Sequence, residues 1–180
     1  MDIRDIREFV RTCDRDTYEL FAQKGNEPSA ESVAEFEKTL GFSIPADLRE
    51  YLLHPLGGLY LGVKEELWPR PKEFAVGPFW MACYGLLAYS LSAEAPPWMS
   101  MRAAWEDMKA AGYPELLPVL KIISDPDPYC LTRTGGLVIW RHEEPDEPET
   151  VTGGFFDALM GEIARLEERK NRLLRTDSIA

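Results

Sequence analysis

The sequence predicts one globular domain in which helices and strands are mixed, the α+β class. Two observations support this prediction. Amphipathic segments with apolar residues at helical spacing alternate with short apolar runs that end at glycine, proline or aspartate. The 180 residues are enough for one domain with a core, and a hydrophobic content of 45% is typical of a globular chain. We find no internal repeat and no interdomain linker in the sequence.

The first element is predicted to be a helix over residues 2–24. Its apolar side chains fall on one helical face, and the Gly25-Asn26-Glu27-Pro28 tetrapeptide ends it. A second helix begins at Ser29 or Ser32, either of which can cap it. Gly41 ends this helix, because glycine readily adopts the left-handed conformation of a C-terminal cap.

A third, short helix follows directly. Pro45 suits the first turn of a helix, where its missing N–H costs nothing, and Asp47 lies near the positive helix end that favours a carboxylate. Gly57 and Gly58 then turn the chain. These segments therefore predict two helices that meet at an angle, with a strand after the second.

The rest of the chain is predicted to contain strands and two further helices. In order, they are a strand at 59–63, two apolar strands at 78–83 and 86–91, a helix from 100 to 111, a strand at 116–123, a hairpin of 129–133 and 137–140, a loop at 143–149 and a closing helix from about residue 152. Residues 74–93 carry no charge, and a run of this length can span a bilayer. Because glycine, proline and serine interrupt the run, we expect buried strands there and no membrane contact.

The order of the first features resembles the opening signature of the SUKH superfamily. This superfamily includes the yeast cell-wall-synthesis regulators and many bacterial immunity proteins. The shared residues are a Glu-Lys pair before Leu-Gly41, the Pro-x-Asp of residues 45–47, and the Gly57-Gly58 pair after the short helix. Leu48 and Leu56 depart from the pattern, since members usually have an aromatic residue and an asparagine there.

The second half of the chain also resembles this family. A Tyr-Cys-Leu strand, a glycine turn, a strand ending at Trp140 and a Phe-Phe-x-x-Leu helix start are similar to the family's usual ending. The resemblance covers roughly residues 30–170 and implies an α+β domain with helices packed around a mainly antiparallel sheet. We therefore expect an N-terminal helical extension (1–28), a SUKH-like domain (29–174) and a tail (175–180). The residues of the structural signature are Gly41, Pro45, Asp47, Gly57, Gly58 and Trp140.

The charge and the cysteines of the chain restrict its partners and its compartment. A formal net charge of −11 and a pI of about 4.7 predict repulsion from nucleic acid and from anionic membranes, and they permit a basic protein partner. Solubility alone also explains such a charge. Cys13, Cys83 and Cys130 are odd in number and lie in apolar contexts, which indicates free thiols in a reducing, cytoplasmic compartment.

No catalytic or metal-binding motif is recognisable, so we predict no enzymatic activity, no metal and no cofactor. Neither His54 nor His142 has a metal-ligand partner three or four residues away. His54 lies at a helix end, where we expect an imidazolium cap. Asp125 and Asp127 flank a proline; a solvated turn explains them better than a cation site, because further oxygen ligands are missing. These two carboxylates are secondary candidates for partner binding.

The segment of residues 143–149 is the clearest candidate for partner binding. Five of its seven residues are acidic and none is basic. The acidic residues are Glu143, Glu144, Asp146, Glu147 and Glu149. Carboxylates in a loop can pair with arginine and lysine of a partner and speed its capture. A solvated exit from the hairpin is the simpler alternative, because charged runs often serve only to hydrate the surface.

The family resemblance implies a binding module. Bacterial members are thought to be immunity proteins that bind and neutralise toxin domains, often nucleases, and an acidic inhibitor would match the cationic cleft of a nuclease. The first hypothesis is therefore a non-enzymatic immunity protein whose partner is a basic toxin domain. The alternatives are an intracellular scaffold or regulator of the fungal type and, less favoured, an enzyme with an unrecognised site.

Overall fold

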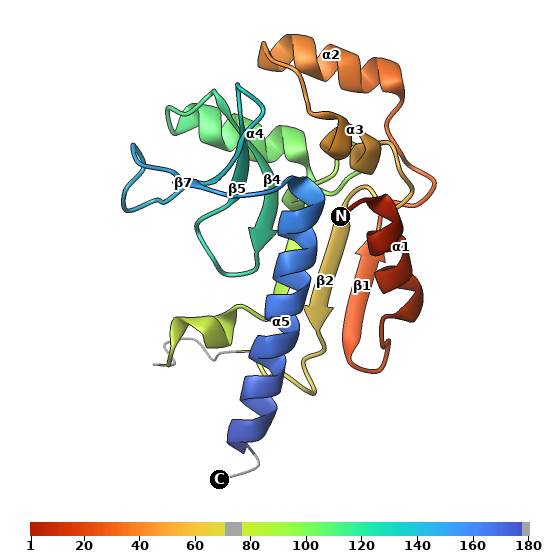
Figure 1. The fold of residues 1–180 in the computed structure, drawn as a ribbon, viewed down its shortest axis with the longest axis vertical. Coiled ribbons are helices and arrows are strands. Elements are labelled where there is room, and N and C mark those ends of the chain that lie inside the picture. The colour runs from red at the N-terminus through yellow and green to blue at the C-terminus, as the bar shows by residue number, and fades with distance from the viewer. Residues whose placement is uncertain (71–76, 178–180) are drawn as a thin grey trace.

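The computed structural model describes residues 1–70 and 77–177, and these form a single α+β domain (Figure 1). Within this part of the chain, five α-helices and two short 3-10 helices accompany one antiparallel sheet of seven strands. In chain order, the elements are α1 (Ile3–Thr12), β1 (Tyr18–Ala22), α2 (Ala30–Leu40), α3 (Ala46–Leu52), β2 (Leu59–Val63), η1 (Phe79–Ala82), β3 (Gly85–Ala88), η2 (Pro97–Met99), α4 (Met101–Ala110), β4 (Leu116–Ile122), β5 (Tyr129–Thr132), β6 (Leu137–Ile139), β7 (Glu149–Thr150) and α5 (Phe155–Asp177). The predicted fold class is confirmed.

The strands lie in the sheet in the order in which they occur in the chain, and each pairs antiparallel with the next. Figure 1 shows α5 running along one face of the sheet, while α1 lies in front of β1. Alternate side chains of β5 point to opposite faces. Tyr129 donates a hydrogen bond to Glu162 of α5, whereas Cys130 packs in one cluster with Met108 of α4. The sheet is therefore covered by α5 on one face and by α4 on the other.

The hairpin and the closing helix agree with their predictions. β5 pairs with β6, and Trp140, directly after β6, is half-buried against Tyr113 with the ring centroids 5.4 Å apart. Phe156, Leu159 and Ile163 of α5 are buried in the main core. α5 extends to Asp177, so the predicted tail (175–180) begins inside this helix, and residues 178–180 lie outside the described part of the chain.

The Gly57-Gly58 turn is held by the buried hydroxyl of Tyr51 in α3. This oxygen accepts hydrogen bonds from the N–H groups of Gly58 and Leu59, both at 2.9 Å, and donates one to the carbonyl of Ala88 in β3 at 3.3 Å. Burial raises the pKa of Tyr51, so its hydroxyl remains protonated and able to donate. One side chain of α3 therefore fixes the start of β2 next to β3.

Asp47 connects α3 to the closing helix. One carboxylate oxygen accepts the N–H of Leu48, and the other accepts the N–H of Phe155 at the start of α5, each at 2.8 Å. A Cβ at Gly154 would lie 2.6 Å from the Asp47 carboxylate, so a side chain there would displace this oxygen. Pro45 is the N-cap of α3 and does not lie within its first turn. The Pro-x-Asp signature is thus a cap that two helices share.

The second helix is bounded largely as the sequence predicts. The side chain of Ser29 accepts the N–H of Ser32 at 3.1 Å, so Ser29 is the N-cap of α2. Gly41 has a φ of 78°, which is the left-handed conformation of a C-cap. The first two helices of the signature therefore meet at Gly41, whose left-handed conformation only a residue without a side chain adopts at low cost.

The predicted helix over residues 2–24 is too long. α1 ends at Thr12, and residues 18–22 form the strand β1 at the edge of the sheet, paired with β2. The Asp14 carboxylate accepts hydrogen bonds from the Asp16 N–H and the Thr17 hydroxyl, which closes a turn after the helix. Along β1, exposed side chains alternate with side chains that are buried or half-buried, so the burial pattern has the period of two of a strand. The N-terminal extension predicted over residues 1–28 is thus helical only in its first half.

The predicted strand at 78–83 is also wrong. Residues 79–82 form the 3-10 helix η1 after Pro78, with Phe79 and Met81 exposed. An uninterrupted apolar run does not distinguish a strand from a short helix. Residues 74–76 of the uncharged run lie outside the described residues. Among the residues that are described, no helix is long and apolar enough to cross a membrane.

Candidate functional site

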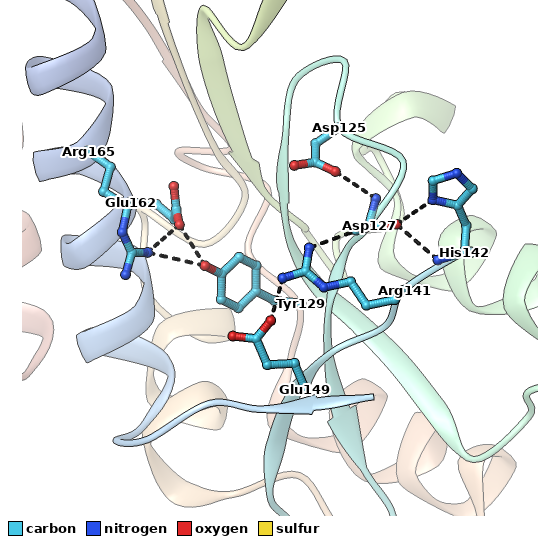
Figure 2. A network of polar contacts seen from close by, with 8 residues as sticks. All are labelled: Asp125, Asp127, Tyr129, Arg141, His142, Glu149, Glu162 and Arg165. Carbon is cyan, nitrogen blue, oxygen red and sulfur yellow. Dashed lines mark hydrogen bonds and ion pairs between the residues drawn. The ribbon is translucent and has the colours of Figure 1, made fainter. Parts of the chain in front are cut away.

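The predicted partner-binding residues lie around the ends of β5, β6 and β7, at one edge of the sheet (Figure 2). Asp125 and Asp127 lie in the turn between β4 and β5, and Glu149 begins β7. Arg141 brings two of these acids together, because its guanidinium pairs with both Asp127 and Glu149. The other acids, Glu143, Glu144, Asp146 and Glu147, are exposed between β6 and β7 and form no ion pair with the rest of the described chain.

Asp127 is the centre of the polar network in Figure 2. Its carboxylate contacts the His142 imidazole at 2.7 Å, the His142 backbone N–H at 3.0 Å and Arg141 Nη1 at 3.2 Å. Burial would raise the pKa of Asp127, but the hydrogen bonds from His142 and Arg141 outweigh burial and lower this pKa. The same contact raises the pKa of His142. Charged hydrogen bonds therefore fix the base of the acidic loop (residues 143–149) to the β4–β5 turn.

Glu162 of α5 lies beside this network and is almost completely buried, with 5% of its side chain exposed. One oxygen accepts a hydrogen bond from the Tyr129 hydroxyl at 2.6 Å and pairs with Arg165. The other oxygen lies 3.7 Å from Arg169 Nη1. Within the described residues, this oxygen and the Nε and Nη2 of Arg169 are buried without a hydrogen-bond partner. α5 thus contributes a buried ion pair whose hydrogen-bonding capacity is only partly used.

A pocket of about 390 Å³ lies between the end of the hairpin, η1 and α5. Phe79 and Trp80 form its apolar side. Its charged lining consists of Asp125, Asp127, Glu149 and Glu162 with Arg141, Arg165 and Arg169. Cys83 also lines the pocket, but burial raises the pKa of its thiol, so it is not an activated nucleophile. No cluster of three or more potential metal ligands occurs in the described part of the chain. The mixed charges suit contact with polar side chains of a protein.

Sequence reasoning missed several members of this site. Glu162 gave one usable signal, because it is an acid between Leu159 and Ile163 on the apolar face of the closing helix. The contact between His142 and Asp127 gave none, since it joins residues 15 positions apart. Arg141, Tyr129 and Arg165 gave none either, because no local spacing connects them.

The expected imidazolium cap at His54 is wrong. Its Nδ1 accepts the N–H of Leu56 at 3.1 Å, which requires an unprotonated nitrogen. Burial, with the nearby charge of Arg7, lowers the pKa of His54. The ring therefore stabilises the turn after α3 as a neutral acceptor.

The two histidines are expected to titrate on opposite sides of the ordinary pKa of 6.5. Protonated His142 donates to Asp127 and also faces Glu143 and Asp125, so its pKa is raised; that of His54 is lowered. The stability that the His142–Asp127 contact adds is present from the lowered pKa of Asp127 up to about pH 6.5, and it is lost as the pH rises through the raised pKa of His142. NMR titration of the ring signals, assigned with a His54→Gln variant, measures both values.

Asp127→Asn provides the control for this titration. It removes the charge beside His142 and leaves His54 untouched, so only the pKa of His142 should fall towards 6.5. A pKa of His142 that is the same in the variant and the wild type would contradict the assignment of Asp127 as the anchor of the acidic loop.

A known protein family matches the part of the chain that contains the signature residues. The model of the SMI1 / KNR4 family (SUKH-1) matches residues 27–161, well over half of the chain. The matched range contains the signature from Gly41 to Trp140 and the acidic loop, and it ends directly before Glu162. No curated protein matches the chain. The suspected resemblance is therefore confirmed, and the chain belongs to the SMI1 / KNR4 family (SUKH-1).

Proposed function

We propose that the protein is a non-enzymatic, cytoplasmic binding module that neutralises a basic toxin domain, such as a nuclease, by direct contact. Membership of the SMI1 / KNR4 family (SUKH-1) supports the coarser part of this proposal, a module of the immunity-protein or SMI1 type. The three cysteines are free, which agrees with a reducing compartment. The net charge of −11 favours a cationic partner.

The observation that carries the proposal is the state of the acidic loop. Glu143, Glu144, Asp146 and Glu147 are exposed and lack an ion pair in the described part of the chain, while Arg141 and His142 hold the base of the loop. Unpaired carboxylates need not break an internal contact before they meet a cation. Because the base of the loop is fixed, less conformational entropy is lost on binding. Such charges act mainly on the rate of association.

Neutralising the four unpaired carboxylates should slow association with the toxin about tenfold at low salt. The variant is Glu143→Gln, Glu144→Gln, Asp146→Asn and Glu147→Gln, and stopped-flow mixing with the toxin domain encoded beside the gene measures the rate. The wild-type rate should fall steeply as salt rises, because ions screen the attraction. The variant should fold normally, since the four side chains are exposed.

A matched control changes the same net charge elsewhere. Glu35→Gln, Glu50→Gln, Asp107→Asn and Glu115→Gln replace four exposed acids on other elements. This set should slow association less than about threefold, because its charges are spread out. If both sets slow association equally, only net charge matters; if neither does, the loop is a solvated exit. A wild-type protein that ignores the toxin but retains many cellular proteins would favour the scaffold alternative.

A further inference from the structure

Three aromatic side chains form one exposed cluster on the face of the sheet away from α5. The Phe21 and Trp98 ring centroids lie 6.4 Å apart, and the Tyr60 and Trp98 centroids lie 6.0 Å apart, edge to face. Phe21 is 46% exposed and Trp98 is 55% exposed, which is unusual for apolar residues of this size. We call Phe21, Tyr60 and Trp98 the aromatic platform. Exposed aromatic clusters of this kind are typical of binding surfaces.

Side-chain alternation places the platform on this face. Tyr18 of β1 hydrogen-bonds to Glu167 of α5, so Phe21, three positions later, points to the opposite side of the sheet. α4 packs chiefly against β4, the central strand, whereas β1 and β2 form one end of the sheet. A Cβ on Gly62 would lie 2.4 Å from the Tyr60 hydroxyl, so the Tyr60 ring lies along the sheet over this glycine.

A negative charge lies next to the platform, and a stacked cation lies near the end of β2. Glu19 is exposed two positions before Phe21, on the same side of β1. The Arg70 guanidinium lies 3.5 Å from the ring centroid of Tyr84, and two backbone carbonyl groups hold it there. Glu19 lies opposite Gly62 in the register of β1 and β2, so it shares the face of the sheet on which the Tyr60 ring lies. The chain therefore already holds one guanidinium on an aromatic ring, next to the end of β2.

We propose that the aromatic platform, with Glu19 at its edge, is a second contact surface that binds arginine and lysine side chains of the basic partner. The basic character of that partner rests on the proposed function. Aromatic faces attract cations through the ring quadrupole, and tryptophan does so most strongly. Glu19 adds a carboxylate for the same cation. The stacked pair of Arg70 and Tyr84 displays the geometry that a partner's arginine would take on Trp98.

The platform and the acidic loop have different tasks in this arrangement. They lie at opposite ends of the sheet, since Phe21 and Tyr60 belong to β1 and β2, Trp98 of η2 packs on them, and the loop precedes β7. Five strand spacings separate β2 from β7, which corresponds to about 24 Å and is within the width of a small protein domain. Charges in an exposed loop mainly raise the association rate, whereas a buried anchor side chain mainly lowers the dissociation rate. Platform variants should therefore change the off-rate.

Binding of an arginine pentapeptide to the full chain tests the platform without the toxin. The indole N–H signals of the five tryptophans are followed by NMR, and a Trp98→Phe variant assigns the signal of Trp98. The Trp98 signal should shift and saturate with the arginine peptide, and it should stay in place with a glutamate pentapeptide. The four-site loop variant should show the same shift. A Trp98 signal that does not move, or that moves only when the acidic loop is intact, would overturn the proposal.

The complex with the toxin domain provides the second measurement. Trp98→Ala should raise the dissociation rate about tenfold with little change in the association rate, as the strength of a cation–π contact implies. Met81→Ala, which removes a 36% exposed apolar side chain outside the platform, is the control and should dissociate like the wild type. If Trp98→Ala dissociates at the wild-type rate, the platform is not a contact surface for this partner. If the wild-type protein does not bind the toxin at all, the proposed function fails, and the peptide titration alone decides on the platform.

Discussion

Replacing Gly58 with alanine is expected to lower the free energy of unfolding by about 3 kcal/mol. Gly58 has a φ of 82°, and a residue with a side chain pays for that left-handed conformation. A Cβ would also lie 2.5 Å from the Ser90 Cβ and 3.0 Å from the Gln23 Cγ, and both neighbours are buried. The turn cannot simply move away, because Gly58 also donates its N–H to the Tyr51 hydroxyl. The midpoint of urea denaturation measures the effect.

Gly41→Ala separates the two causes. Gly41 has a similar φ of 78°, but a Cβ there would meet nothing within 4 Å. This variant should therefore lose only about 1 kcal/mol, the cost of the backbone conformation. Equal denaturation midpoints for the two variants would show that the contact with Ser90 is relieved by a small shift, and that the second glycine of the pair is required only for its conformation.

Replacing Glu162 with alanine should lower the free energy of unfolding by about 3 kcal/mol, because it leaves the largely buried cation of Arg169 without its counter-charge. The side chains are 5% exposed for Glu162 and 19% for Arg169, so water replaces the lost contact poorly. The Tyr129 hydroxyl also loses its acceptor. The pair with Arg165 contributes little, since that side chain is 58% exposed. Denaturation midpoints at neutral pH measure the loss.

Glu149→Ala is the matched control on the opposite side of the same pocket. Glu149 also pairs with an arginine, Arg141, but its side chain is 57% exposed and Arg141 keeps its contact with Asp127. The expected loss is below about 1 kcal/mol. If Glu162→Ala costs no more than Glu149→Ala, burial does not distinguish the two ion pairs. Glu162→Gln should fall between them, because it keeps an acceptor for Tyr129 but removes the charge.

The fold was predictable where local chemistry and tertiary packing agree. Gly41 and the hairpin of residues 129–140 were correctly predicted, since each has a strong turn or period signal. The prediction of a helix over residues 13–24 failed because the apolar residues there fit the spacing of a helix as well as that of a strand. Pairing with β2 favours the strand. The segment 78–83 failed because an apolar run of six residues contains no period that separates a strand from a 3-10 helix.

The candidate site was predictable only in its surface part. The charge of the acidic loop is visible in the composition of residues 143–149. The anchors of the loop are not, because Asp127 meets His142 only after the β4–β5 turn and the end of β6 have come together. Glu162 lies on another element again, and only its position on the apolar face of α5 indicates that it is buried. Contacts between distant segments follow from the fold and not from any local pattern.

The order of the strands also determines where the chain loses most entropy when it folds. Short turns join β4 to β5 and β5 to β6, and only the acidic loop separates β6 from β7; closing such short connections costs little. The cap from Asp47 to Phe155 instead closes a loop of 108 residues. Because this cost grows only with the logarithm of the loop length, the long connections from β1 to β2, from β2 to β3 and from β3 to β4 add comparable amounts. The locally connected strands β4 to β7 are therefore expected to pair before β1, β2 and β3 join the sheet.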